Sequence, residues 1–363
     1  MRYILPAFFI LAIFATPVQS ADSDILKPNH FPSLISSIRI NASLDFCGEP
    51  LDLDNSDIRE RLEKEMLLIL WNRAQIVLWI KRSGRYFPII EKMLKEHNMP
   101  EDLKYVPIVE SALLPHIGSD KGALGYWQFI KTTGRRYGLE INSRKDERRN
   151  IFPSTRAAIA YFKKLHGTFG SWSLAAAAYN MGGKGLQTQV LLQNTKNYYQ
   201  LYLPLETQRY VLRIVAVKII LSNLENYGFR LAKEDLYPPL QFDRIMIKSS
   251  QQTPVALIAQ AAKTQYKVIK DLNPEIRGRS LAAGNHWIMI PKGKTPGFQS
   301  LLKKNRKQWV KIKPKGIYVV KKGDNLSMIS KRFNIPLSTL LARNRLKKNK
   351  PIHPGDRLVV SSD

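Results

Sequence analysis

The chain has 363 residues, of which 44% are hydrophobic and 10% aromatic, so it can bury one sizeable core and one or two smaller domains. This composition excludes a disordered or fibrous chain. The 57 Lys and Arg against 29 Asp and Glu give a net charge of +28, which predicts a polyanionic partner. The single cysteine, Cys47, excludes an internal disulfide.

The first 20 residues have the pattern of a secretion signal. Arg2 precedes an apolar stretch over residues 3–14, and small residues come before Ala21. The apolar stretch is short for a membrane span, although an uncleaved anchor stays open as an alternative. Cys47 lies too far along the chain to be the lipid-bearing cysteine that follows some export signals. We therefore expect an exported, soluble protein of the periplasm or cell envelope, with peripheral association with the envelope membrane as the alternative.

Residues 21–55 are irregular and contain proline, and we expect them to pack as an N-terminal extension outside the next domain. Residues 56–235 are expected to form an all-α domain, because apolar residues recur there at helical spacing. No alternating strand pattern appears before about residue 240. Helices are predicted at 56–84, 86–97, 154–166, 173–180 and 205–227, with a further helix that begins at Pro100. Gly84 is expected to end the first helix, and Asn55 or Ser56, and later Ser154, to act as N-caps.

After Pro238 the pattern changes, and a repeat appears at an offset of 71 residues. The matched pairs are Val255 and Leu326, Ile258 and Ile329, Ile269 and Leu340, Asn273 and Asn344, Leu281 and Ile352, and Gly284 and Gly355. Each copy is predicted to form a strand, two short helices and a closing strand. This places small α+β modules at 243–291 and 317–361, joined by a basic linker at 292–316.

The C-terminal part carries much of the positive charge, with 17 Lys and Arg against 3 acidic residues between positions 301 and 363. Nucleic acid is the usual partner of such a segment inside a cell, but the export signal argues against it. Outside the cytoplasm the available polyanions are cell-wall glycan with its peptide carboxylates, and anionic lipid headgroups. We therefore expect peptidoglycan strands as the partner and no nucleic acid.

Glu110 stands at the end of an apolar helical run, residues 107–113, and a Gly-rich loop over 119–129 follows. Burial against apolar and aromatic walls disfavours the ionised form of a carboxyl group and raises its pKa. Such a group can deliver a proton near neutral pH, as general-acid cleavage of a glycosidic bond requires. The alternative interpretation is a glutamate that caps or pairs within a helical core. The segment Asp146-Glu147-Arg148 is interpreted as a structural salt-bridge turn rather than as a second catalytic acid.

Four motifs resemble, in chain order, those of the soluble-type lytic transglycosylases: Glu110-Ser111, Gly125-Tyr-Trp-Gln128, Ala178-Tyr-Asn180 and Glu206-Thr-Gln-Arg-Tyr210. Residues 318–360 resemble a LysM module, with a Gly-Asp turn and a helix-borne Asn. The resemblance implies a mainly α fold class, with a lysozyme-like all-α catalytic domain followed by two small βααβ LysM-like modules. The first module is expected to be degenerate, because Gln252-Thr253 replaces Gly-Asp.

The same resemblance implies roles for individual residues. Glu110 would be the sole catalytic acid and base, with Tyr210 hydrogen-bonded near its carboxyl group. Substrate-binding positions would be Ser111, Tyr126, Trp127, Gln128, Tyr179, Asn180 and Tyr210. Glycan-binding positions of the second module would be Gly323, Asp324, Asn325, Leu326, Asn344 and Ile352. Alternatives stay open: Tyr126, Trp127 and Tyr210 as core residues, Asn180 as a helix C-cap, and the two matched Asn residues of the repeat as structural groups.

The implied activity is cleavage of the β-1,4 bond between N-acetylmuramic acid and N-acetylglucosamine in peptidoglycan. Its products would have 1,6-anhydro-N-acetylmuramic acid ends, and the LysM module would target the enzyme to the wall. A lysozyme-like hydrolase and a non-catalytic peptidoglycan-binding scaffold are the alternatives. No cofactor is expected, and no metal, because His97, His116 and His166 share no metal-ligand spacing.

Overall fold

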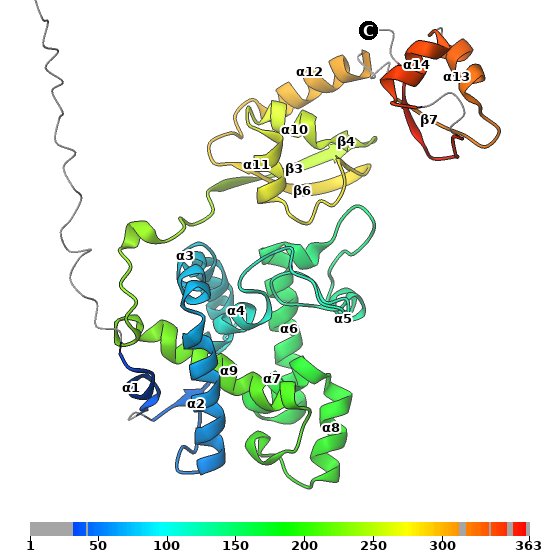
Figure 1. Cartoon of the computed structure of the whole chain (residues 1–363). Coiled ribbons are helices and arrows are strands. Elements are labelled where there is room, and N and C mark those ends of the chain that lie inside the picture. Colours follow the sequence, from blue (N-terminus) through cyan, green and yellow to red (C-terminus); the bar gives the residue numbers. More distant parts are fainter. Residues whose placement is uncertain (1–31, 41–42, 312–316, 334, 347–350, 361–363) are drawn as a thin grey trace, which may run out of the picture. The chain divides into compact units, whose positions relative to one another are not determined.

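The computed structural model describes residues 32–40, 43–311, 317–333, 335–346 and 351–360. The predicted signal segment, residues 1–20, lies outside the described residues. The chain is mainly helical, and most of its short strands follow residue 241 (Figure 1). This confirms the predicted mainly α fold class with small α+β modules. The chain divides into two compact units.

Unit 1 holds the described residues up to Gly84, Pro100–Val109 and Phe162–Tyr237. Its elements are α1 (Leu34–Ile38), β1 (Asp45–Phe46), β2 (Glu49–Pro50), α2 (Ser56–Trp71), the first half of α3 (Arg73–Glu96), the 3-10 helix η2 (Glu101–Tyr105), α7 (Trp172–Met181), α8 (Gly183–Leu192) and α9 (Leu205–Ser222). Helix α9 forms the centre of the core, because its buried side chains pack against α2 and α7. Four consecutive alanines of α7, residues 175–178, are fully buried, which lets the helices approach closely.

The first predicted helix is in fact two helices, and Gly84 ends neither of them. Helix α2 begins after Asn55, whose side-chain oxygen accepts two backbone hydrogen bonds of the first turn, as predicted. The helix breaks at Asn72, and α3 then continues through Gly84 to Glu96. A Cβ at Gly84 would lie 2.8 Å from the Cβ of Leu236. Close packing, and not a helix stop, therefore requires glycine at this position.

Helix α6 (Ile151–Phe169) begins earlier than predicted, and Ser154 is not its N-cap. Instead, Oδ1 of Asn150 accepts a hydrogen bond from the backbone N–H of Phe152 at 3.1 Å. Ser154 lies inside the helix, where its hydroxyl donates to the carbonyl of Asn150 at 2.6 Å. Helix α9 ends at Ser222, before its predicted end, and a 3-10 turn follows. The hairpin β1–β2 and helix α8 were not predicted, because short elements carry little periodicity.

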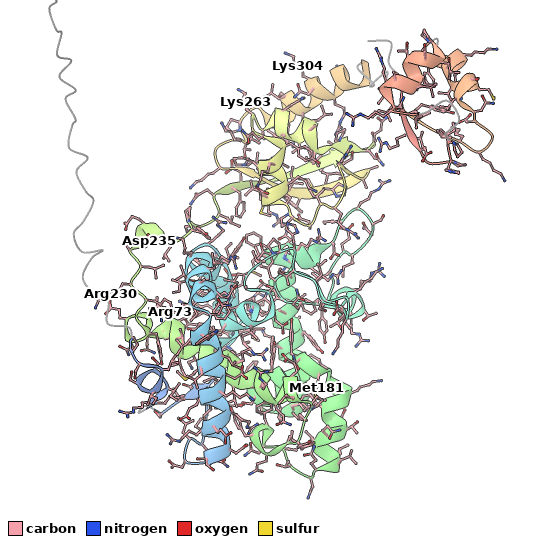
Figure 2. The ribbon with its side chains drawn as sticks, in the orientation of Figure 1. Arg73, Met181, Arg230, Asp235, Lys263 and Lys304 are labelled. Atoms are coloured by element: carbon pink, nitrogen blue, oxygen red, sulfur yellow. The ribbon has the colours of Figure 1, made fainter. Side chains whose placement is uncertain are left out.

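The segment after α9 returns to the start of α3. The guanidinium of Arg73 donates to the backbone carbonyls of Tyr227 and Gly228, at 3.0 Å each. Figure 2 labels Arg73 on α3, and Arg230 and Asp235 on the returning segment. These contacts fasten the end of the helical domain within unit 1, so the domain closes on its own first helices before the chain enters the C-terminal modules.

Unit 2 holds Arg85–Met99, Glu110–Tyr161 and the described residues from Pro238 onward. Its first part contains the second half of α3, the end of α4 (Val106–Ser111), α5 (Lys131–Arg136), the 3-10 turn η3 (Glu147–Arg149) and the start of α6. The first module follows, with β3 (Phe242–Ser249), β4 (Thr253–Pro254), α10 (Val255–Ala261), α11 (Tyr266–Leu272), β5 (Ser280–Leu281), β6 (Gly284–Pro291) and α12 (Phe298–Lys311). Strand β3 pairs antiparallel with β6 along its whole length, and β4 pairs with β5.

Helix α12 corrects the prediction of a linker at 292–316. Its side chains Phe298 and Leu302 are buried in the same core as α10, α11 and the β3–β6 pair, so the helix belongs to the first module. Figure 2 labels Lys263 and Lys304 on this module. Phe298 and Leu302 stand at a helical spacing of four residues, which the many lysines and prolines of the segment hide.

The second module contains β7 (Ile317–Val319), α13 (Leu326–Phe333), α14 (Leu337–Arg343) and β8 (Arg357–Val359), with β7 antiparallel to β8. It repeats the first module, since α10 and α13 begin at the matched residues Val255 and Leu326. Asn273 and Asn344 make the same contacts. Each side-chain oxygen accepts a hydrogen bond from a backbone N–H at the closing strand, at 2.7 and 2.6 Å, and each side-chain nitrogen donates to backbone carbonyls. These contacts agree with the structural interpretation of the two Asn residues.

Candidate active site

Glu110 is the next-to-last residue of α4 and is half-buried. The two residues that follow the helix, Ala112 and Leu113, both have left-handed backbone, with φ of 52° and 59°. Such conformations are uncommon outside glycine, cost about 1–3 kcal/mol each, and cluster at functional sites. The chain therefore turns sharply after Glu110, in a conformation that the rest of unit 2 must stabilise.

Ser111 connects this helix end to the Gly-rich loop. Its side chain is buried, and its hydroxyl donates a hydrogen bond to the backbone carbonyl of Tyr126 at 2.9 Å. A buried hydroxyl with a backbone partner holds two chain segments at a fixed separation. Ser111 thereby orients the end of the helix that carries Glu110 against the loop.

A buried ion pair closes the loop. Gly125 has a φ of 83°, and a Cβ there would lie 2.0 Å from the carbonyl oxygen of Arg148, so only glycine fits. The guanidinium of Arg148 donates to the carbonyls of Gly122 and Phe129, at 2.9 and 3.0 Å, and pairs with Asp146 at 2.7 Å. The predicted salt-bridge turn is confirmed, and it holds the loop at both ends.

The two aromatic residues of the second motif lie in the core of unit 2. The exposed fractions of Tyr126 and Trp127 are 3% and 1%. The indole N–H of Trp127 donates to Oγ1 of Thr155 at 2.9 Å, and the ring of Tyr126 packs edge-on against Tyr86, with centroids 5.2 Å apart. Burial raises the pKa of the Tyr126 hydroxyl well above its usual value. This placement agrees with the core interpretation, in which both rings support the loop from behind.

Gln128 contacts the same loop with its side chain. Its backbone is left-handed, with a φ of 46°, and the residue is half-buried. Its Nε2 donates to the carbonyls of Ile117 and Gly125, at 2.9 and 2.8 Å. Within the described part of the chain its Oε1 accepts no hydrogen bond.

The other half of the predicted site lies in unit 1. Tyr179 stacks on Phe162, with ring centroids 4.6 Å apart and 4° between the ring planes. Oδ1 of Asn180 accepts a hydrogen bond from Oγ1 of Thr207 at 2.8 Å, which joins the end of α7 to the start of α9. Tyr210 is 1% exposed, on the buried face of α9. Thr207 was not among the predicted site residues, although it stands inside the fourth motif.

Further contacts hold the end of α7 and the start of α9. Helix α7 has Gly182, with a φ of 94°, as its C-cap, so Asn180 is not the cap. Arg209 and Arg213 of α9 both pair with the carboxylate of Glu65 in α2, which is buried. A buried charge needs such partners, because leaving it unpaired costs several kcal/mol, on the order of 3–5. The ion pairs therefore set the rotation of α9 against α2.

The contacts of the predicted site thus fall into two halves, one in each unit. Glu110 and its loop belong to unit 2, whereas Asn180, Thr207 and Tyr210 belong to unit 1. The predicted hydrogen bond between Tyr210 and the carboxyl group of Glu110, and the raised pKa of Glu110, stay predictions. Among the described residues, no group of three or more His, Cys, Asp or Glu is arranged to hold a metal ion.

The predicted glycan-binding residues of the second module make contacts within that module. Oδ2 of Asp324 accepts from the hydroxyl of Tyr318 and the backbone N–H of Lys321, at 2.6 Å each. These two bonds, the Tyr318 bond first, lower the pKa of Asp324. Oδ1 of Asn325 accepts from the N–H of Met328 at 2.8 Å, in the first turn of α13. Of the other predicted positions, Gly323 has a positive φ in the turn, and Leu326 and Ile352 pack against the core of the module. Asn344 bonds to the closing strand.

Three family models match the chain. The Transglycosylase SLT domain covers residues 87–202, the Lytic transglycosylase MltD, LysM-like domain covers 241–307, and the LysM domain covers 318–361. A relative, membrane-bound lytic murein transglycosylase D of Escherichia coli, is 32% identical over 340 residues, which are 87% of this chain and 72% of the relative, with the same values in a second strain. The chain also matches the crystal structure of the 70 kDa soluble lytic transglycosylase of Escherichia coli, with 16% identity and a TM-score of 0.36; the match covers 50% of this chain and 31% of that one.

The helical domain with its motifs, followed by two LysM-type modules, defines a lytic transglycosylase that acts on peptidoglycan. More narrowly, the chain belongs to the family of membrane-bound lytic murein transglycosylase D. The family model that matches the first module extends to residue 307, in agreement with the packing of α12 in the core of that module. Within the described residues, no helix is both long enough and apolar enough to span a membrane.

Proposed function

We propose that the chain cleaves the β-1,4 bond between N-acetylmuramic acid and N-acetylglucosamine and leaves a 1,6-anhydro end, with Glu110 as the sole acid and base. One observation carries the proposal. Glu110 stands at a helix end that is followed by two left-handed residues and is tied through Ser111 to a loop closed by Arg148. A preorganised catalytic acid needs neighbouring residues that hold it in place, and backbone strain of this kind is concentrated at functional sites.

A single carboxyl group can serve both steps of this reaction. Glu110 first gives its proton to the glycosidic oxygen while the bond from that oxygen to C1 of the muramic acid breaks and N-acetylglucosamine leaves. As a carboxylate it then takes the proton of the C6 hydroxyl while O6 bonds to C1, so Glu110 ends protonated and no water is consumed. Closure within one sugar has the entropic advantage of an intramolecular reaction.

The usual glycosidase mechanism needs a second carboxylate near the first. In unit 2 the acid of the salt-bridge turn, Asp146, is buried and paired with Arg148 through both of its oxygens. A carboxylate held in this way is unsuited to activate water or to attack a sugar. The lysozyme-like alternative therefore has less support than ring closure.

The remaining motif residues are proposed to bind the sugar chain. Gln128 offers its Oε1, and Tyr179 and Asn180 stand at the end of α7, half-buried and held by Phe162 and Thr207. Tyr210 is proposed to bond near the carboxyl group of Glu110. For Tyr126 and Trp127 the contacts support an indirect part, in which the rings hold the loop in shape.

The second module is proposed to bind wall glycan and so to target the enzyme, which we infer to be exported to the cell envelope. Asp324 and Asn325 hold the turn before α13 through backbone bonds. The turn backbone, and not these carboxyl and amide groups alone, would then present the binding surface. The positive charge of this part of the chain favours a wall that carries peptide carboxylates.

The test is digestion of purified wall by the wild-type chain and by Glu110→Gln, with the products resolved by mass. The proposal expects muropeptides one water lighter than reducing-end products from the wild type, and no release by Glu110→Gln. Reducing-end products from the wild type would favour the hydrolase. Unchanged release by Glu110→Gln would remove Glu110 from the mechanism.

A further inference from the structure

Unit 2 contains a pocket of about 230 Å³ whose lining includes none of the predicted catalytic or substrate-binding residues. One wall comes from the turn before α6 and the start of α6, and the other comes from the first module. The residues that matter are Asn150, Phe152, Arg156, Arg244, Glu275 and Trp287. The volume lies below the roughly 300–1,000 Å³ of pockets for drug-sized ligands, so it suits one small group such as an amino-acid residue.

Backbone hydrogen bonds fix the two walls to each other. The N–H of Asp146 donates to the carbonyl of Glu275, and the N–H of Arg277 donates to the carbonyl of Arg144, at 2.8 Å each. The rings of Phe152 and Phe242, one from each wall, also pack edge-on, with centroids 5.5 Å apart. Because one of these bonds is made by the backbone of Glu275 itself, this residue is held in place without any ligand.

Glu275 is 3% exposed and has an incomplete set of partners. The side chain of Asn150 hydrogen-bonds to it, but within the described chain its buried Oε2 has no hydrogen-bond partner. A buried polar atom of this kind costs about 1–3 kcal/mol and calls for an explanation. Burial, the largest effect, raises the pKa of Glu275 to about 7, so near neutral pH the group can hold a proton and donate it in a hydrogen bond.

The outer part of the pocket carries positive charge and an aromatic face. The guanidinium of Arg244 lies 4.7 Å from the ring centroid of Trp287, which is 50% exposed. Arg156 is exposed on the opposite wall. Guanidinium groups bind carboxylates through charge-assisted hydrogen bonds, and an indole face packs on methyl groups or sugar rings. The matching ligand therefore has a carboxylate outside and a carbonyl acceptor inside.

We propose that this pocket binds the peptide side chain of peptidoglycan, with a peptide carboxylate on Arg244 and Arg156 and an amide carbonyl on Glu275. The proposal rests on the proposed function, since it assumes that the wall is the substrate. The peptide-free probe, an oligomer of N-acetylglucosamine, has amide carbonyls but no carboxylate for the two arginines. The first module would then select peptide-bearing wall for the helical domain, in a pocket that lies outside the predicted substrate-binding positions.

The charged groups around Glu275 determine how binding depends on pH. Lys145 lowers and Glu147 raises the pKa of Glu275, and Lys270 of α11 also interacts with it. Arg156 and Arg244 add positive charge to the same pocket. The donor form of Glu275 is present below its pKa, so binding should be strongest below about pH 7 and should weaken above it.

The experiment measures binding of a muramyl peptide to the full chain by calorimetry, at about pH 6 and about pH 8.5, with an N-acetylglucosamine oligomer as the peptide-free probe. For the wild type we expect affinity about tenfold or more weaker at the higher pH. Glu275→Gln keeps a donor without the charge, so its affinity should not change with pH. Arg244→Gln should lose about tenfold at both pH values, whereas Lys304→Gln, an exposed charge on α12 (Figure 2), should match the wild type.

Muramyl peptide affinity that is equal in the wild type and Arg244→Gln would overturn the proposal, as would no binding by the wild type. A pH dependence that persists in Glu275→Gln would remove Glu275 from the pocket's chemistry. Wall cleavage separates this inference from the proposed function. A chain that releases anhydro products but binds no muramyl peptide refutes only the pocket, and a chain that binds the peptide but cleaves no wall refutes only the enzyme mechanism.

Discussion

Two glycines of the Gly-rich loop differ in what surrounds them, and the difference predicts opposite outcomes for one substitution. Gly122 and Gly125 both have positive φ, of 75° and 83°. A Cβ at Gly122 meets nothing within 4 Å, whereas a Cβ at Gly125 would lie 2.0 Å from the carbonyl oxygen of Arg148 and 2.6 Å from its carbonyl carbon. Alanine therefore strains the backbone at both positions but clashes at only one.

The magnitudes follow from these contacts. Gly122→Ala should cost about 1–2 kcal/mol for the left-handed conformation. Gly125→Ala adds an overlap with backbone atoms that must move, worth about 1–3 kcal/mol more. That movement displaces the loop to which Ser111 ties the helix of Glu110. Because a shift of about 1 Å in a catalytic group can cost on the order of a hundredfold in rate, Gly125→Ala should lose about that much activity.

The assay is the initial rate of muropeptide release from purified wall, together with thermal unfolding of each variant. Gly122→Ala should retain most of the wild-type rate, with a slightly lowered Tm. Gly125→Ala should have both a much lower rate and a much lower Tm. Equal rates for the two variants would refute the claim that the approach of Arg148 shapes the loop.

Three further predictions concern the modules. Asn273→Ala removes three buried hydrogen bonds, each worth about 0.5–1.5 kcal/mol, and should speed amide hydrogen exchange in β6. Asn344→Ala, at a half-buried position, should have a smaller effect on hydrogen exchange in β8. Equal effects of the two substitutions would contradict the importance of burial. The lowered pKa of Asp324 contributes stability that is present above the ordinary carboxyl pKa and is lost as the pH falls through the lowered value. Tyr318→Phe removes one cause of the lowered pKa, so the acid unfolding of the second module, followed by NMR, should move to higher pH. An unchanged midpoint of acid unfolding would count against the role of that bond. Deletion from residue 316 onward should weaken binding to purified wall and leave cleavage of soluble glycan intact, and a pull-down with equal binding would argue against targeting by this module.

Much of the helical domain could be predicted, because long helices repeat their apolar residues with a clear period. Gly84 shows the limit of this reasoning. Glycine is a common helix stop, but here it is required by the approach of Leu236, about 150 residues further along the chain. Helix α12 shows another limit, since its few apolar residues are surrounded by lysines. No local pattern distinguishes either case.

The candidate site was predicted by its motifs, and the roles of individual side chains were harder to predict. Tyr126 and Trp127 are residue types that suit both a sugar groove and a core, and only their burial in the fold separates the two interpretations. Thr207 has no feature that marks it until Asn180 is seen to accept its hydrogen bond. The pocket around Glu275 joins residues of α6 and of the first module, so its parts are adjacent only in the fold.

The central claim is that the sugar attacks itself and that Glu110 transfers both protons. Digestion of wall in water labelled with heavy oxygen tests it most directly, because hydrolysis adds one oxygen from the solvent to each new end and ring closure adds none. The account predicts product ends without label from the wild type and no product from Glu110→Gln. Labelled ends from the wild type would contradict it.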